Sequence, residues 1–249
     1  MKPIALQLYT VRDAAAAGFP AVLKRVAGIG YRGVEFAGLH GMAPAEVKTI
    51  VDDLGLEVSS AHMALPTAEN AQQLIDECQT LGVPKLVTGP GGPIDTMDKI
   101  LACADRLNAA VDLLSDAAIA FGLHNHWAEF EEVEGRYPED VLLEEVPGLF
   151  AQLDVYWITV GGPDPVATVA RLKDRAPLLH IKDGPVEPKE PHTAVGQGKL
   201  DIPAIVKAAD PNVLDWLIVE LDSCATDMWE AVEQSYAYMV GNGLAAGNK

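Results

Sequence analysis

The chain has 249 residues, 49% of them apolar and 22% charged, which is the composition of a globular protein with a sizeable core. Its 36 acidic residues outnumber its 18 basic ones and give a net charge of −18. A field of that sign repels phosphate backbones, so we expect no nucleic-acid partner. It also disfavours multiply phosphorylated substrates, whereas a neutral sugar or a hydroxy-ketone fits better.

The sequence also indicates where the protein works. No apolar run approaches the roughly 18 residues that a membrane span needs. The N-terminus goes directly into a strand-like pattern and has no signal-peptide features. Cys78, Cys103 and Cys224 are odd in number and far apart, which favours three reduced thiols over a disulfide or a metal knuckle. We therefore expect a cytoplasmic protein that does not associate with membranes.

Short β-branched runs alternate with amphipathic helical stretches along the whole chain. Strands are expected at residues 4–10, 33–36, 57–62, 84–89, 118–126, 150–156, 178–182 and 217–221. Helices are expected at residues 20–30, 44–54, 67–81, 94–115, 164–174, 202–209 and 227–240, with a short helix in the looser region that ends at residue 145. Eight strand–helix pairs without a break in composition predict one parallel sheet covered by helices.

The length of the chain favours a closed barrel over an open sheet. An eight-unit chain of this size fits a single (β/α)8 TIM barrel, one domain over residues 1–249, better than a doubly wound fold. No GxGxxG follows the first strand, and the GPGG segment at 89–92 lacks the Lys-Ser/Thr of a phosphate loop. A nucleotide-binding fold is therefore poorly supported.

Six of the eight predicted strands end in ionisable side chains, where a barrel built only for packing would end in apolar or turn residues. They are Glu35, His62, His124 with His126, Asp154, His180 with Lys182, and Glu220 with Asp222. In such barrels the chemistry gathers at the carboxyl ends of the strands, and strand residues two apart share a face. Burying these groups is costly unless they are paired or bound to a cation. We therefore expect Asp154, Glu220 and histidine to hold one divalent ion, with Mn²⁺, Co²⁺, Mg²⁺ and Zn²⁺ not separated by this ligand set.

Each of these residues has a plainer explanation when it is taken alone. A strand-end aspartate such as Asp154 often caps the next helix, and a lone histidine is more often a hydrogen-bonded core residue than a ligand. The coincidence over strands five to eight favours a site. Trp127 and Trp157 follow strand ends and are candidates for stacking on a sugar, whereas Trp216 and Trp229 are expected to pack.

Seven segments, spread over nearly the whole chain, resemble the xylose isomerase-like barrel superfamily and specifically its sugar phosphate isomerase/epimerase-type members. They are LQLYTVRD (6–13), GYRGVEFAG (30–38), GLHNHWAEF (122–130), QLDVYW (152–157), LLHIKDG (178–184), VGQGKLD (195–201) and WLIVELD (216–222). The resemblance is specific for the barrel. It is less specific for the reaction, because relatives include ketose epimerases, hydroxypyruvate- and inosose-processing enzymes, dehydratases and a DNA-repair endonuclease.

The resemblance also implies a ligand set. In the family one metal is held by a Glu at the end of strand five, an Asp at strand six, a His at strand seven and a Glu at strand eight. Asp154, His180 and Glu220 match, but His124 stands where the family has the first residue of Glu-Asn-His. Either His124 supplies an imidazole ligand, or His126 or Glu129 takes over. A symmetric mechanism with two glutamates is therefore not implied, although a His base paired with one Glu remains workable.

We expect a metal-dependent sugar isomerase or epimerase that abstracts a proton next to a carbonyl through a metal-stabilised enediolate. Glu220 or a histidine of the HNH segment, His124 or His126, would move the proton. Lys182 would hydrogen-bond a substrate oxygen or support the enediolate. The substrate-binding candidates are Gln7 and Tyr9, two apart on the first strand, together with Glu35, His62, Glu129 and Trp157.

Two other functions stay open at this point. A lyase would use the same metal and the same first proton transfer, then eliminate a β-substituent from a 3-keto sugar or glycoside. A non-catalytic sugar-binding subunit would bind metal without exchanging a substrate proton with D₂O. In each case the partner is a small carbohydrate, with a homo-oligomer or a partner subunit also open. An endonuclease is least expected, because that class needs more histidine ligands and a positive surface.

Overall fold

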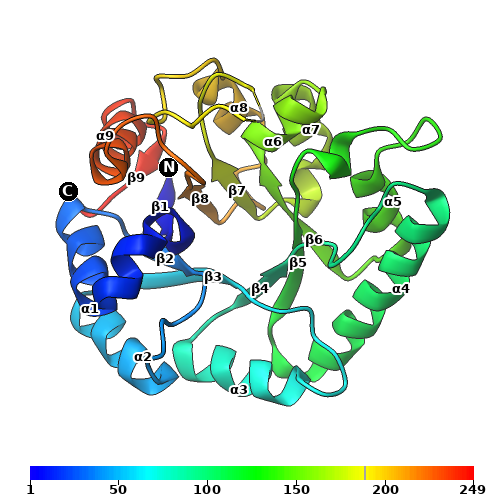
Figure 1. The fold of residues 1–249 in the computed structure, drawn as a ribbon, viewed down its shortest axis with the longest axis horizontal. Helices are drawn as coiled ribbons and strands as arrows, with labels where there is room; N and C mark the ends of the chain where they lie inside the picture. The colour runs from blue at the N-terminus through cyan, green and yellow to red at the C-terminus, as the bar shows by residue number, and fades with distance from the viewer. Residues whose placement is uncertain (188) are drawn as a thin grey trace.

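Parallel strands β1 to β8 form a closed barrel in this computed structural model, which describes residues 1–187 and 189–249. The strands are β1 (Lys2–Gln7), β2 (Gly33–Phe36), β3 (Glu57–His62), β4 (Lys85–Thr88), β5 (Ala120–His124), β6 (Leu149–Asp154), β7 (Leu178–Ile181) and β8 (Trp216–Val219). Each pairs with the next along the chain, and β8 pairs with β1 to close the sheet (Figure 1). The short strand β9 (Ala245–Ala246) adds to the start of β1. The expected (β/α)8 barrel is confirmed.

The segments that link the strands run around the outside of the barrel as helices (Figure 1). The α-helices are α1 (Arg12–Ile29), α2 (Pro44–Asp53), α3 (Ala71–Leu81), α4 (Met97–Leu114), α5 (Pro138–Glu145), α6 (Val155–Gly161), α7 (Pro165–Leu172), α8 (Ile202–Ala208) and α9 (Met228–Gly241). Short 3₁₀ helices are η1 (Leu8–Val11), η2 (Ser115–Ala117), η3 (Ala128–Phe130) and η4 (Lys173–Arg175). Side chains at the N-caps of α4, α7, α8 and α9 accept a first-turn backbone hydrogen bond, which explains these helix starts. Among the residues described, no helix has the length and apolar character to cross a membrane.

The inside of the barrel has an apolar floor beneath a polar layer. The floor is the buried cluster of Ala5, Val87, Leu178, Trp216 and Ile218, against which Phe150 packs. Gly33 and Gly122 leave room for its two rings, because a Cβ at either position would collide with Trp216 or Phe150. Since alternate strand residues share a face, Gln7, His180 and Glu220, two places after floor residues, form part of the layer above. The strand pattern thus places polar groups at the carboxyl end of the barrel.

Six of the eight strands end one to three residues earlier than the sequence predicts, and the ends of β1 and β5 each have a side-chain cause. The strand expected over residues 4–10 stops at Gln7, whose Oε1 accepts a hydrogen bond from the Tyr9 backbone and caps η1. The prediction that Tyr9 lies on this strand is therefore wrong. The strand expected over residues 118–126 stops at His124, after which the Asn125 amide bonds both backbone polar groups of Asp154. This amide replaces the strand pairing, so His126 does not share the strand face of His124.

Two helices also depart from expectation. The first begins at Arg12 instead of residue 20, because extended backbone at Gly18, two residues before Pro20, interrupts the apolar periodicity. The sequence gives no sign of α6, which follows β6 directly. Its start is capped by Asp154, whose Oδ1 accepts hydrogen bonds from the backbone of Tyr156 and Trp157, both at 3.0 Å.

Candidate active site

Four ionisable side chains converge where β5, β6, β7 and β8 end. His124, Asp154, His180 and Glu220 each offer one ligand atom, and these atoms all lie within 4.8 Å of one another. All four side chains are buried. They come from successive strands, so the closed sheet brings their carboxyl ends to one place. These are the four residues that the sequence proposes as metal ligands.

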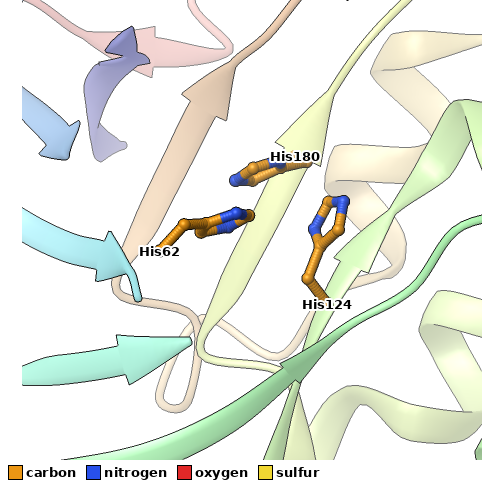
Figure 2. A group of neighbouring side chains, drawn as sticks. All are labelled: His62, His124 and His180. Atoms are coloured by element: carbon orange, nitrogen blue, oxygen red, sulfur yellow. The ribbon is translucent and has the colours of Figure 1, made fainter. Parts of the chain in front are cut away.

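A second group overlaps with the first. His62, His124 and His180 also offer ligand atoms within 4.8 Å of one another, and Figure 2 shows their three rings facing each other across the barrel. The ring centroids of His124 and His180 are 4.7 Å apart, and the His62 ring lies parallel to that of His180 at 5.4 Å. His62, from the end of β3, therefore completes the opposite side of the cluster.

The donor set fits a divalent cation. Asp154 Oδ2 is buried and accepts no hydrogen bond from the described residues, while its Oδ1 is used by the helix cap. The Lys182 ammonium forms an ion pair with Oδ2 at 3.0 Å, without the geometry of a hydrogen bond. An orphaned carboxylate oxygen beside two imidazoles and a second carboxylate is a ligand set that Zn²⁺ or Mn²⁺ accepts.

Lys182 lies beside this cluster with its side chain fully buried. Its Nζ is 2.9 Å from Glu220 Oε2 and 2.8 Å from Asp222 Oδ2, in addition to the Asp154 contact. Burial alone would lower the pKa of Lys182, but the three carboxylates together raise it above its usual value. Lys182 was expected to contact a substrate oxygen. In the structure its ammonium forms ion pairs with three carboxylates, and Lys182 does not line the cavity.

His180 is held between two carboxylates. Its Nδ1 lies 2.7 Å from Glu220 Oε2 and its Nε2 lies 2.5 Å from Glu35 Oε2. Burial opposes ionisation of the ring, but Glu35 and Glu220 outweigh it and raise the pKa of His180 to about 10. The pKa of Glu220 moves down because Lys182 and His180 outweigh its burial. The pKa of His124 shifts in the opposite direction to that of His180, because burial and the neighbouring His180 and His62 lower it well below 6.5. A neutral His124 has a lone pair available for a ligand bond.

Glu35 and Gln7 lie next to the cluster, where Glu35 contacts His180. Glu35 is fully buried, and its oxygens accept hydrogen bonds from Gln7 Nε2, Ser60 Oγ and Gln152 Nε2 at 2.5–2.6 Å, besides the His180 contact. Burial would raise the pKa of Glu35, but His180 and His62 lower it to about 2. We expected Gln7 and Glu35 to line the substrate wall. The structure buries both of them beside His180, and neither lines the cavity.

A cavity of about 430 Å³ opens above the cluster. It is lined by Tyr9, Ala37, His62, His124, His126, Trp157, Glu220 and Asp222. Tyr9 reaches it from η1 and is 44% exposed, and Trp127 is 41% exposed on the rim with its ring 5.1 Å from that of Trp157. Two larger grooves of about 600 Å³ lie outside, along α5 and α4. We assign the site to the smaller cavity because the buried ionisable cluster opens into it.

His124, His126 and Glu129, the three candidates for the metal ligand at the end of strand five, lie in different places. His124 joins the ligand cluster, and His126 is exposed on the cavity wall. Glu129 turns away, and its Oε2 accepts a hydrogen bond from the His126 backbone at 2.8 Å. Burial raises the pKa of Glu129. Its carboxylate thus braces the HNH loop and does not line the cavity to which we expected it to contribute.

Sequence reasoning missed the neutral polar residues of the site. The Gln152 amide oxygen lies 2.6 Å from His62 Nε2 and 3.1 Å from His124 Nδ1, and Ser60 bonds Glu35. A signal was present, because Gln152 and Ser60 each stand two places before a strand-end residue of the cluster, Asp154 and His62 respectively. Asp183 was also missed. It accepts hydrogen bonds from the backbone of Gly184, Gly196, Gly198 and Leu200 and pins the loop before α8.

The fold and this cluster define a parallel β/α barrel whose mouth gathers histidines and carboxylates suited to a divalent cation. The chain belongs to the xylose isomerase-like TIM barrel family, whose model matches residues 23–238. The resemblance seen in the seven sequence segments is thereby confirmed.

Solved structures agree with this family. A sugar phosphate isomerase/epimerase from Parabacteroides distasonis is 28% identical, with a TM-score of 0.82 over 98% of this chain and 96% of that one. An L-ribulose 3-epimerase is 18% identical, with a TM-score of 0.72 over 98% of this chain and 95% of that one. A D-allulose 3-epimerase from Methylomonas sp., in complex with D-allulose, is 16% identical, with a TM-score of 0.74 over 96% of each chain. The last two likenesses show the fold alone. Among curated proteins, no sequence match to the chain was found.

Proposed function

We propose that this protein is a divalent-metal-dependent sugar isomerase or epimerase that moves a proton on the carbon next to a carbonyl. The observation that carries the proposal is the buried cluster of His124, Asp154, His180 and Glu220, with one orphaned carboxylate oxygen, at the bottom of the cavity. The 28% identical sugar phosphate isomerase/epimerase supports the reaction class.

These four residues would hold the ion. When bound, it would act as a Lewis acid that stabilises the negative charge of an enediolate. The Lys182 ammonium forms ion pairs with Asp154 and Glu220, and Asp154 is held in place by its cap on α6. The positions of the donors are therefore fixed by the barrel before a substrate arrives.

Glu220 and the HNH segment both line the cavity and are the candidates for proton transfer. Glu220 is ionised, so it can accept a proton from an acidified C–H bond. In the HNH segment, His126 lines the cavity and is exposed, while His124 belongs to the ligand cluster. We assign the second proton position to His126. The pair is a carboxylate and an imidazole, unlike the paired glutamates that the family resemblance implies.

The substrate we propose is a small carbohydrate with little negative charge. The net charge of −18 repels polyanions, and by the same argument we propose no nucleic-acid partner. Trp157 on the wall and Trp127 on the rim offer apolar faces for a sugar ring. His62 contributes a polar contact from β3, while Tyr9 contributes one from η1.

A lyase acting on a 3-keto sugar or glycoside is the second candidate. The asymmetry of Glu220 and His126 favours it, because elimination needs one proton acceptor and does not need a matched group on the opposite face. Both reactions begin with the same proton abstraction, so the products distinguish them.

The test is product analysis with metal-loaded protein. Purified protein loaded in turn with Mn²⁺, Co²⁺, Mg²⁺ and Zn²⁺ is incubated with a panel of ketoses, aldoses and 3-keto glycosides, and the products are identified by NMR. We expect one substrate class to be isomerised or epimerised, and the Asp154→Asn variant to lose both metal and turnover. Asp95→Asn, which changes an exposed aspartate paired with Lys99, is the matched control. Bound metal without turnover of any substrate would contradict the proposal that the protein is an enzyme and would favour a sugar-binding subunit.

A further inference from the structure

Glu35 is a fully buried carboxylate of the polar layer. Its two oxygens accept hydrogen bonds from Gln7, Ser60, Gln152 and His180. It is outside both groups of potential metal ligands and does not line the cavity. Its position therefore argues against a direct contact with substrate or metal.

Its first effect is on His180. A carboxylate oxygen only accepts, so His180 Nε2, at 2.5 Å from Glu35 Oε2, carries a hydrogen. The other nitrogen, Nδ1, faces Glu220 Oε2 at 2.7 Å. Once a cation replaces the proton between Nδ1 and Glu220, Glu35 keeps the remaining proton on Nε2. Nδ1 is then the nitrogen with a free lone pair.

Its second effect passes through Gln152. Glu35 Oε1 accepts the Gln152 Nε2–H at 2.5 Å, and this fixes which end of the amide points away from Glu35. The amide oxygen consequently faces His62 Nε2 at 2.6 Å and His124 Nδ1 at 3.1 Å. Because that oxygen also only accepts, both nitrogens carry hydrogens. His124 is left with its lone pair on Nε2.

We propose that Glu35 is a positioning residue that sets the tautomers of both histidine ligands, so that His180 binds the cation through Nδ1 and His124 through Nε2. This inference rests on the metal binding of the proposed function and adds the atoms that make the bonds. Partners behind a metal ligand orient it and raise its basicity, and their loss typically costs about 10–100-fold in metal affinity.

The first test needs no variant. In protein loaded with Zn²⁺, ¹⁵N NMR of the imidazole rings distinguishes metal-bound, protonated and free nitrogens. We expect a metal-bound Nδ1 with a protonated Nε2 in His180, and the reverse in His124. A metal-bound Nε2 in His180 would overturn the inference.

The second test is the Glu35→Gln variant, titrated with Zn²⁺ and Co²⁺ by calorimetry. The new amide can donate to His180 Nε2 and force the hydrogen onto Nδ1, so we expect affinity to fall about 10–100-fold and the visible spectrum of bound Co²⁺ to change. Ser60→Ala is the control, because it removes one hydrogen bond to Glu35 but leaves both histidine connections. Unchanged affinity in a folded Glu35→Gln protein overturns the inference. Wild-type protein that binds no cation overturns the proposed function as well, whereas bound cation without sugar turnover counts against the function alone.

Discussion

Asp183 offers the clearest stability prediction, because one fully buried side chain holds four backbone N–H groups. Its Oδ1 accepts from Gly184 at 2.9 Å and Leu200 at 3.2 Å, and its Oδ2 accepts from Gly196 at 2.9 Å and Gly198 at 3.0 Å. In Asp183→Asn one oxygen becomes an NH₂ group that meets two N–H donors. Two charge-assisted bonds at about 1.5–3 kcal/mol each are lost, so we expect the free energy of unfolding to fall by about 3–6 kcal/mol.

The assay is thermal unfolding followed by calorimetry. For a chain of this size about 1 kcal/mol shifts Tm by roughly 2–4 °C, so Asp183→Asn should lower Tm by about 6–24 °C. The matched control is Asp201→Asn, which changes the exposed N-cap of α8, where aspartate and asparagine are equally effective. A Tm for Asp183→Asn as close to wild type as that of the control would refute the reasoning.

Three further predictions concern the rim, the HNH segment and a buried glutamate. His124→Ala should lose metal, whereas His126→Ala should keep its metal and lose about 10²–10⁴-fold in turnover. Wild-type metal content and activity in both variants would show that the HNH segment has no part in the mechanism. Trp127→Ala should raise KM about 2–10-fold with little change in kcat, and an equal effect of Trp229→Ala, far from the cavity on α9, would argue against stacking. Burial, reinforced by the charges of Glu129 and Asp140, raises the pKa of Glu139 well above 4.5. The unfolded form therefore loses its proton first, and stability falls by about 1.4 kcal/mol per pH unit from 4.5 up to the pKa of the folded state. In urea unfolding, Glu139→Gln should gain stability over wild type as pH rises from 4.5, and parallel pH curves would contradict this.

The barrel was predictable because its strands are apolar runs at regular spacing, and the ligand cluster because ionisable residues end successive strands. The strand ends at Gln7 and His124 were not predictable, since each depends on a side-chain amide that bonds a backbone group, Gln7 to Tyr9 and Asn125 to Asp154. Strand periodicity tells which face a residue takes but not how deep in the barrel it lies. That is why Glu35 was expected on the cavity wall but is buried outside the cavity lining.

The neutral polar residue Gln152 was not predicted as part of the site, for a related reason. Gln152 has the same parity as Asp154 on β6, yet a glutamine in an apolar strand gives no chemical signal until its partners are known. Its importance comes from contacts with His62, His124 and Glu35, which arrive from three other strands. Lys182 is similar, because its burial among three carboxylates depends on distances that sequence spacing does not contain.

The central claim is a metal-dependent proton transfer next to a carbonyl, and solvent deuterium incorporation tests it most directly. Metal-loaded protein is incubated in D₂O with its best sugar substrate, beside chelator-treated protein and the Asp154→Asn variant, and the product is examined by NMR and mass spectrometry. We expect deuterium at the carbon beside the carbonyl with loaded wild-type protein and none with the other two. Product that forms without deuterium at that carbon would contradict proton exchange with solvent. Deuterium incorporation by chelator-treated protein and by the Asp154→Asn variant would contradict the metal dependence of the reaction.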